Sequence, residues 1–170
     1  IAQKNVAGVH GALSIETDGT WTYASKDALD WISEGKSVTD SFTVSSADGT
    51  TTTVQVTING TNDPAILVPV AVSLDETNEP LKPSGKLSIK DVDSPETFVA
   101  QSNVTGKNGS FSLETSGQWS YVANSAFDEL NVGRRGSDPL SVASADGTTT
   151  TVQVTINGTN DPAILGSASV

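Results

Sequence analysis

Apolar and polar residues alternate along several short stretches of this chain. Between Val54 and Ile58 every second residue is apolar, and the residues in between are Gln55 and Thr57. Successive side chains of a β-strand point to opposite faces of a sheet, so a period of two indicates a strand with one buried face. The same period occurs at residues 13–15, 21–23 and 42–44. The pattern therefore predicts a chain made of short, half-buried strands.

Turn signals separate these strands. Asp-Gly pairs occur at Asp18-Gly19, Asp48-Gly49 and Asp146-Gly147. Glycine readily adopts the positive φ that a tight turn needs, so each pair predicts a β-hairpin.

Two more strands are predicted in the middle of the chain, one from Val68 to Leu74 and one that includes Leu87 and Ile89. Pro69 lies in the first of them and has no N–H to donate, so this strand is expected to be interrupted or at a sheet edge. The helical signal is limited to one turn, at the apolar i, i+3 pair of residues 29 and 32.

The chain also contains an internal repeat. The sequence SADGTTTTVQVTINGTNDPAIL occupies residues 46–67 and again residues 144–165. The offset of 98 residues (144 minus 46) aligns Trp21 with Trp119 and Asp63 with Asp161. Repetition at a fixed spacing is typical of modules arranged in tandem. We expect a first repeat over residues 1–63 that lacks its N-terminal third, a complete second repeat over 64–161, and the start of a third repeat or a tail over 162–170.

These observations predict an all-β fold of tandem antiparallel β-sandwich modules, immunoglobulin-like in architecture, with about seven short strands in a complete repeat. Alternation places Trp21 and Trp119 on the core face of their strands. The first repeat has no counterpart of residues 64–98, so its sheet edges and core would need a cover. We expect another chain or the tail 162–170, which begins with the same Pro-Ala-Ile-Leu sequence as residues 64–67, to supply it.

Charge narrows the classes of partner. Twenty acidic residues against nine basic ones give a net charge of −11, which repels nucleic acids and anionic membrane surfaces. No apolar run is long enough to span a membrane, so we expect no membrane insertion. No signal peptide is recognisable, and we interpret the sequence as an excised fragment. Multivalent cations are better candidate partners, because carboxylates offer the oxygen ligands that such cations prefer.

Three aspartates near the boundary of the two repeats are the main candidate metal ligands. Asp63 ends the first repeat, and Asp91 and Asp93 follow a predicted strand early in the second. Carboxylates separated by one residue can converge on one cation, and Asn62 or its backbone carbonyl can assist. The alternative is a solvated acidic loop. Secondary candidates are Asp75, Glu76 and Asp146.

Catalytic residues do not form a recurring set. His10 is the single histidine, and it lies in a Gly-rich stretch. Asp27/Asp30 and Asp128/Glu129 are pairs of carboxylates as a glycosidase uses, but such pairs cap a short turn equally well. We therefore expect no enzymatic activity. Trp31 aligns with Glu129 in the other repeat, which favours exposure to solvent or to a neighbouring module and makes Trp31 the candidate for stacking on a sugar.

Three stretches carry a family resemblance, namely DGTWTY at 18–23, SFTVSSADGTTTTVQVTINGTNDPAI at 41–66 and DVDS at 91–94. They resemble VCBS-type repeats of large bacterial surface adhesins of the RTX kind, which are similar in design to cadherin domains. The second repeat departs from this pattern with SGQWSY at 116–121 and GRRGSDPLSV at 133–142.

The resemblance implies a secreted module on the bacterial cell surface that acts in attachment or biofilm formation, with calcium stiffening the junctions between modules. Its partners would be neighbouring repeats of the same chain and, by strand exchange, another copy. The alternative function is a carbohydrate-binding or protein-binding module that recognises a surface ligand through Trp31 and the loops at 33–41 and 132–139, where the repeats differ most.

Overall fold

The structure is a computed structural model that describes residues 1–163, and within these residues it contains fourteen strands and no helix. This confirms the all-β class. The chain divides into two compact units, one formed by residues 1–63 with 92–94 and the other by residues 64–91 with the residues from 95 onward.

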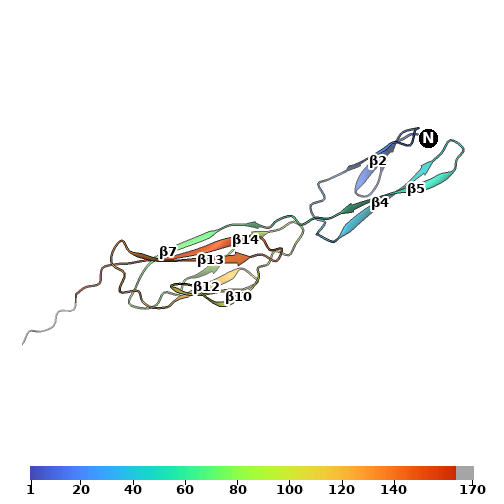
Figure 1. The fold of residues 1–170 in the computed structure, drawn as a ribbon. Helices are drawn as coiled ribbons and strands as arrows, with labels where there is room; N and C mark the ends of the chain where they lie inside the picture. The colour runs from blue at the N-terminus through green and yellow to red at the C-terminus, as the bar shows by residue number, and fades with distance from the viewer. Residues whose placement is uncertain (164–170) are drawn as a thin grey trace, which may run out of the picture. The chain divides into compact units, whose positions relative to one another are not determined.

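The first unit consists of two small sheets (Figure 1). One sheet has the order β1-β2-β3 and the other pairs β4 with β5. The buried core of this unit is small, since it contains Leu13 from the first sheet and Phe42 and Val44 from the second. The strands are β1 (Gln3–Ala7), β2 (Gly11–Ile15), β3 (Trp21–Ser25), β4 (Ser37–Ser45) and β5 (Thr51–Asn59).

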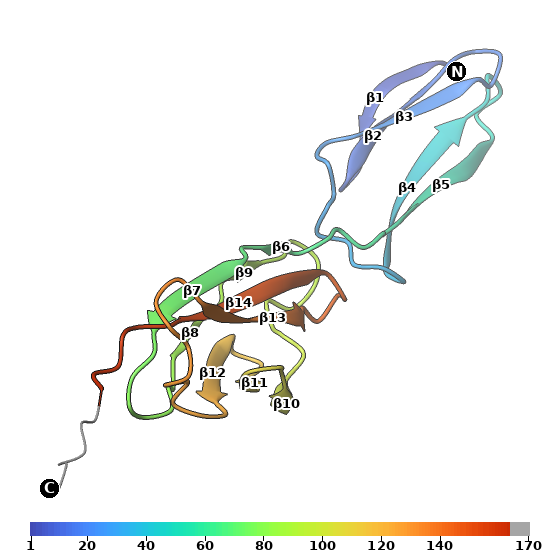
Figure 2. The same cartoon turned by 60° about the vertical axis from the view of Figure 1, so that its left-hand side comes forward.

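The second unit is a fuller sandwich, and Figure 2 shows its two larger sheets as separate layers. One layer has the order β10-β11-β12-β8 and the other β13-β14-β7, while β6 pairs with β9 alone. Side chains of Phe111, Trp119 and Tyr121 from one layer pack with Val152 and Val154 from the other. The strands are β6 (Ile66–Leu67), β7 (Val70–Asp75), β8 (Ser84–Lys86), β9 (Ile89–Lys90), β10 (Gln101–Thr105), β11 (Gly109–Leu113), β12 (Gln118–Ala123), β13 (Arg135–Ala143) and β14 (Thr149–Asn157).

One strand pair differs from the expected antiparallel arrangement. β7 runs parallel to β14, with a register from Val152↔Val70 to Asn157↔Asp75. The first long strand of the repeat therefore lies beside the last one, and both run in the same direction. Pro69 separates β6 from β7, so the prediction of an interrupted strand is confirmed.

The three Asp-Gly hairpins are confirmed. They connect β2 to β3, β4 to β5 and β13 to β14. Their glycines, Gly19, Gly49 and Gly147, have φ values of 90°, 88° and 90°. An L-residue with a Cβ rarely adopts this conformation, which explains the recurrence of glycine at the turn.

The strand predicted around Leu87 and Ile89 is only partly correct. β8 ends at Lys86 and β9 begins at Ile89, so Leu87 lies between two strands. Its side chain is buried in the core of the second unit, and its N–H donates to the carbonyl of Gly117 at 2.9 Å. Alternation marked the buried residues correctly, but it did not detect that the chain turns between them. The expected helical turn is a non-helical turn in which Ile32 N–H donates to Leu29 O at 3.1 Å.

The predicted burial of the two repeat tryptophans is correct for one of them. Trp119 is 3% exposed, whereas Trp21 is 51% exposed, so its assignment to the core was wrong. In the second unit β8 pairs with β12 and brings Gly85 opposite Trp119. Among residues 1–163, β3 pairs with β2 alone, so its other edge and Trp21 have no such cover.

Each unit also buries an aspartate that the sequence pattern did not single out. Asp138 accepts hydrogen bonds from the backbone N–H groups of Lys107 and Asn108 and from the Tyr121 hydroxyl, the last at 2.7 Å. In the first unit Asp40 accepts equivalent bonds from backbone N–H groups of the β1–β2 loop and from the Tyr23 hydroxyl at 2.9 Å. A buried carboxylate is stable only when such donors replace water. Asp40 and Asp138 therefore fix the loops that precede β2 and β11.

Candidate metal site

Three carboxylates come together in the second unit, from Glu76, Asp128 and Asp161. Each offers an oxygen atom that lies within 4.8 Å of the oxygens offered by the other two. Glu76 follows β7, Asp128 lies in the loop between β12 and β13, and Asp161 lies beyond the end of β14. Segments far apart in the sequence therefore assemble this acidic cluster at one end of a sandwich.

The parallel pairing of β7 with β14 positions Glu76. Its N–H donates to the carbonyl of Asn157 at 2.8 Å, which continues the ladder by one residue. Its carboxylate oxygen Oε1 accepts hydrogen bonds from the N–H and the hydroxyl of Thr159, at 2.8 and 2.5 Å. The residue is 4% exposed, so these donors replace water at a buried acid.

The charges in this cluster are not balanced by basic side chains. No ion pair joins the carboxylates of Glu76, Asp128 and Asp161 to a basic side chain among residues 1–163. The pKa of Asp161 is raised above its usual value by burial and by the negative charges of Glu76 and Asp128. A bound cation would favour the ionised form of this acid, because it offsets the negative charges of the neighbouring carboxylates.

The donor set fits a calcium ion. Calcium binds six to eight oxygen ligands in flexible geometry, mostly from carboxylates, carbonyls and water. The cluster has three carboxylates and no nitrogen or sulfur ligand, which disfavours zinc and copper. Carboxylates from three segments of the chain match the preferences of calcium.

The structure brings part of the predicted junction site together in the first unit. Asp63 N–H donates to Asp93 Oδ2 at 3.4 Å, and Ser94 Oγ lies 3.5 Å from Asn62 Oδ1. Ser33 donates a short hydrogen bond to the carbonyl of Asp93. Asn62, Asp63 and Asp93 are thus close neighbours.

The remaining member of that predicted set, Asp91, belongs to the second unit, where it directly follows β9. Its convergence with Asp63 on one cation stays a prediction. Of the secondary candidates, Glu76 is part of the acidic cluster. Asp75 ends β7 and accepts a hydrogen bond from Asn157 Nδ2 at 3.2 Å, outside the group of three carboxylates.

Asp146 has a clear structural role in its hairpin. Its carboxylate accepts hydrogen bonds from the Ser144 hydroxyl, from the N–H and hydroxyl of Thr148, and from the N–H of Ala65 at 3.0 Å. Burial alone would raise the pKa of Asp146, but these donors outweigh it and lower the pKa well below its usual range. The carboxylate joins the hairpin to the segment before β6, and a metal at this residue stays a prediction.

Trp31 is exposed, as its alignment with a glutamate predicted. It is 53% accessible, and its ring centroid lies 6.0 Å from that of His10 with the planes tilted by 43°. The pair offers two ring faces in one area of the first unit. Binding of a sugar at Trp31 stays a prediction.

The sequence analysis missed Asp128 and Asp161 as metal candidates. The signal for Asp161 was present, because Asp161 is the repeat counterpart of the chosen residue Asp63. Asp128 had been weighed only as one of a pair of acids at a turn. No local pattern marks it as a ligand, since its neighbours in the cluster come from elsewhere in the sequence.

The second unit is thus an all-β sandwich with an acidic cluster beyond its last strand. Residues 62–158 match the bacterial cadherin-like domain family, and the chain belongs to this family. Cadherin-like domains are in general extracellular adhesion modules that occur in tandem and bind calcium.

A solved structure of protocadherin gamma B7 extracellular cadherin domains 1–4 is also similar, at 16% identity and a TM-score of 0.43. The match covers 89% of this chain and 40% of that one, so the chain spans less than half of that structure. No curated protein sequence matches the chain. No helix of residues 1–163 is long and apolar enough to cross a membrane.

Proposed function

We propose that the chain is a non-catalytic repeat of a secreted bacterial adhesin of the VCBS and RTX kind. In this role it acts as a calcium-stiffened spacer at the cell surface in attachment or biofilm formation. The acidic cluster of Glu76, Asp128 and Asp161 is the main support, together with membership of the bacterial cadherin-like family. The stretches quoted above support the narrower assignment to VCBS-type adhesins.

The position of the cluster explains how calcium would stiffen the chain. Asp161 directly precedes Pro162, just as Asp63 precedes Pro64 where the chain enters the second repeat. Glu76 already holds the segment after β14 through its bonds to Thr159. Bound calcium would neutralise the three carboxylates and tie this exit segment to the sandwich. By the same reasoning we propose that Asn62, Asp63, Asp91 and Asp93 hold a second ion.

Calcium titration of the whole chain tests the proposal. Extracellular calcium modules commonly bind with dissociation constants of about 10⁻⁴ to 10⁻³ M. At about 100 times that constant, binding adds roughly 2.7 kcal/mol to the free energy of unfolding. We expect calcium to raise the melting temperature and to narrow the distribution of conformations in small-angle scattering. The variants Glu76→Gln and Asp161→Asn should lose the effect in the second unit.

Asp75→Asn is the matched control, because it removes an acid beside Glu76 that is outside the cluster. It should keep the response to calcium. Identical melting and scattering in chelator and in millimolar calcium would rule out a calcium-stiffened spacer.

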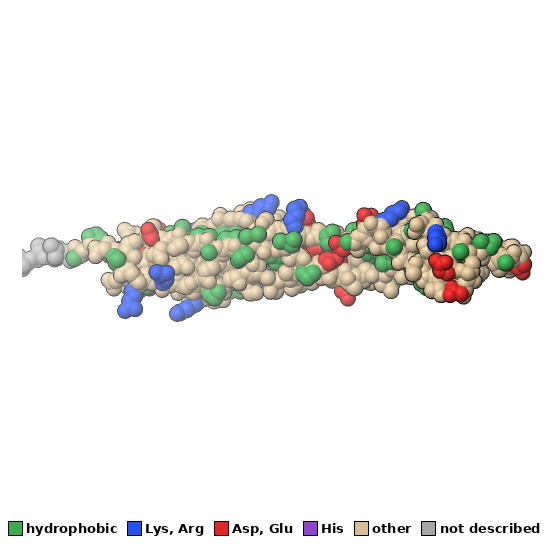
Figure 3. All heavy atoms as spheres, turned by 90° about the horizontal axis from the view of Figure 1, so that it is seen from above, with side chains coloured by type: hydrophobic (Ala, Val, Ile, Leu, Met, Phe, Trp, Pro, Cys, Tyr) green, Lys and Arg blue, Asp and Glu red, His purple; other side chains and the backbone are tan. Residues whose placement is uncertain are grey.

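A carbohydrate-binding or protein-binding module is the second candidate function. The exposed ring of Trp31 beside His10 favours it, because sugars commonly stack on aromatic faces. Basic side chains lie in separate places on the face shown in Figure 3, and the net charge is −11, so an anionic polymer is a poor ligand. Binding on a glycan array that disappears in Trp31→Ala would support this function.

A further inference from the structure

Four Asn-x-Ser/Thr sequences occur in the chain, and this pattern is the acceptor sequence for N-linked sugars. They begin at Asn59, Asn103, Asn108 and Asn157. We propose that Asn103 is the acceptor in the folded protein, and that the attached sugar shields the open edge of β10. The proposal goes beyond the spacer role and does not depend on calcium.

Three of the four acceptor sequences are enclosed at their middle residue, which is a glycine in each. A Cβ added to Gly60 would lie 2.0 Å from the carbonyl oxygen of Ile32, and one added to Gly158 would lie 2.1 Å from that of Leu130. The third glycine, Gly109, is buried. A transferase must surround the acceptor sequence with its own cleft, and at these three places another part of the chain already occupies that space.

In two of the enclosed sequences the side-chain nitrogen that would bond to the sugar is also engaged. Asn108 Nδ2 donates to Asp138 Oδ1 at 3.1 Å, and Asn157 Nδ2 donates to the Ser73 hydroxyl at 3.0 Å. Each nitrogen would have to give up its hydrogen bond before it could react. The fold therefore protects these asparagines in two ways.

The sequence that begins at Asn103 is open to solvent. Residues 102–105 are all exposed, and Val104, the middle residue of the acceptor sequence, is 43% exposed. Asn103 lies where the register of β10 against β11 shifts, and its φ is 48°. Within residues 1–163 its hydrogen bonds, both with Ser112, use its backbone N–H and its side-chain oxygen. The nitrogen Nδ2 is thus available for reaction.

The first unit contains the same backbone feature without an acceptor sequence. Asn5 has a φ of 51° at the equivalent shift between β1 and β2, and its N–H donates to the Ser14 hydroxyl at 3.0 Å. The geometry around Asn103 therefore belongs to the fold of the repeat. What distinguishes Asn103 is the sequence of its strand.

That sequence indicates what the sugar does. Both β1 (QKNVA) and β10 (QSNVT) are edge strands within residues 1–163, as Figure 2 shows for β10. A lysine on an edge strand opposes pairing with a strand of another chain. β1 has Lys4 and Ala7 where β10 has Ser102 and Thr105. β10 thus lacks the lysine and gains the hydroxyl of an acceptor sequence, and a hydrophilic sugar at this edge would replace the charge as the block to pairing.

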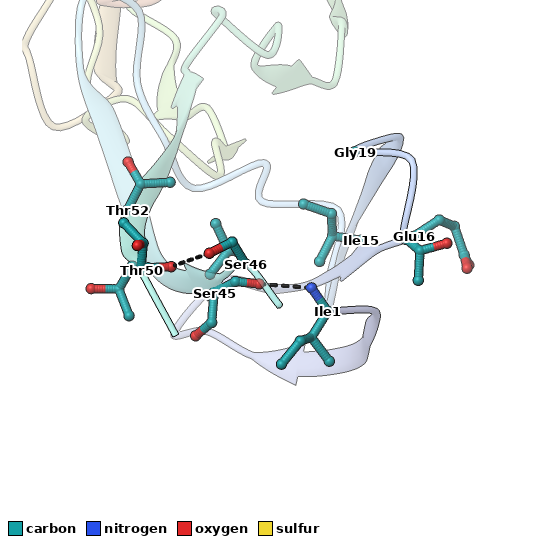
Figure 4. Close-up of a pocket in the computed structure, with 11 residues that line it drawn as sticks. Ile1, Ile15, Glu16, Gly19, Ser45, Ser46, Thr50 and Thr52 are labelled. Carbon is teal, nitrogen blue, oxygen red and sulfur yellow. Dashed lines mark hydrogen bonds between the residues drawn. The ribbon is translucent and has the colours of Figure 1, made fainter. Parts of the chain in front are cut away.

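The cavity of about 280 Å³ in the first unit, shown in Figure 4, offers less to a sugar. Its lining contains no aromatic side chain. Two of its polar groups are bonded within the protein, because the Ser46 hydroxyl donates to Thr50 O at 3.1 Å and the ammonium group of Ile1 donates to Ser45 O at 2.7 Å. The tail expected to cover this unit lies outside the described residues from residue 164 onward.

The modification is a transfer from a sugar activated by a diphosphate, catalysed by a transferase. Asn103 Nδ2 attacks C1 of the sugar, so that an N–C1 bond forms while the C1–O bond to the diphosphate breaks. The diphosphate leaves with the electron pair, and Nδ2 gives up one proton to a base of the transferase. The hydroxyl of Thr105 is the group that completes the recognition pattern.

The test treats the whole folded chain with a soluble bacterial N-glycosyltransferase and glucose activated by uridine diphosphate. Mass spectrometry of proteolytic peptides locates the added hexose. Each rate is divided by the rate for a short synthetic peptide with the same acceptor sequence, which removes the preference of the enzyme itself. We expect Asn103 to react at least about tenfold faster than Asn59, Asn108 or Asn157, because the enclosed sequences must first open.

A matched pair of variants tests the acceptor sequence at an exposed residue. Thr105→Ala should abolish modification at Asn103, and Thr105→Ser should keep it. The assignment fails if Asn103 is not modified, if the three enclosed asparagines react as fast, or if Thr105→Ala is still modified.

Light scattering at matched concentrations tests the shielding of the edge. The glycosylated chain, and the unmodified chain carrying Ser102→Lys, should both self-associate less than the unmodified chain. Equal association of the three samples would overturn the shielding role.

Discussion

Trp21 and Trp119 occupy the same position in two aligned repeats, and yet Trp21 is 51% exposed and Trp119 is 3% exposed. Trp21 lies in β3 opposite Ile15, and Trp119 lies in β12 opposite Leu113. The difference arises from β8, which pairs with the strand of Trp119. The burial of Trp119 therefore depends on residues 84–86, which lie outside its own hairpin.

Replacing each of these tryptophans by alanine should lower the free energy of unfolding by different amounts. Trp119→Ala should lower the free energy of unfolding of the second unit by about 3 to 5 kcal/mol, because it removes a large buried side chain. Trp21→Ala should cost the first unit about 1 kcal/mol or less, as is usual for an exposed residue. Scanning calorimetry that resolves the two units measures both. Equal losses in the two variants would contradict the difference in burial.

Hydrogen exchange should distinguish the two copies of the strand sequence TTTVQVTIN. Both copies yield the same proteolytic fragment, with the same intrinsic exchange rates, so any difference in mass reports structure alone. Within residues 1–163, β14 is bonded to a neighbouring strand on both sides, whereas β5 pairs on one side. We expect two mass envelopes of equal size, with the faster one from β5. A single envelope would mean that the two edges are protected alike.

The Tyr–Asp contacts give another matched pair of variants. Tyr121→Phe removes the hydroxyl that donates to buried Asp138 at 2.7 Å, and a bond to a charged group contributes about 1.5 to 3 kcal/mol. Tyr23→Phe removes the equivalent donor to Asp40 in a less buried unit, so a smaller loss is expected. Denaturant unfolding of each variant provides the comparison, and a larger loss for Tyr23→Phe would refute it.

Tyr121 should also resist ionisation. Burial, and then the hydrogen bond and charge of Asp138, raise the pKa of Tyr121 far above 10. A raised pKa favours the neutral phenol in the fold, so this stability is present below pH 10 and is lost as the pH rises above that value. Ultraviolet titration should show Tyr121 ionising only as the second unit unfolds.

Two aspartates of the second unit should influence stability in opposite directions. The pKa of Asp161 is raised, so the ionised group opposes folding above its unfolded value of about 3.8. Asp161→Asn should therefore raise the melting temperature in chelator at pH 7 and have no such effect at pH 3. The pKa of Asp146 is lowered, so its contribution is present above about pH 3.8 and is lost as the pH falls through the folded value.

Asp146→Asn is the control, because it should lower the melting temperature at pH 7 where Asp161→Asn should raise it. Stabilisation by both variants, or by neither, would contradict the electrostatic account of the acidic cluster.

Local features of this protein were readable from its sequence. Alternation identified β2, β3, β4, β5 and β7, and Asp-Gly pairs identified the hairpins at Gly19, Gly49 and Gly147. The exact duplication of 22 residues identified the repeat. These features depend on the conformation of neighbouring residues, which local sequence controls directly.

Tertiary structure alone decided which strands became neighbours. A period of two tells which face of a strand is apolar, but it does not tell what covers that face or that β7 would run parallel to β14. The clustering of Glu76 with Asp128 and Asp161 and the exposure of Trp21 both follow from that choice of neighbours. Burial and charge clustering depend on residues distant in the sequence, so two identical segments of this chain have different environments.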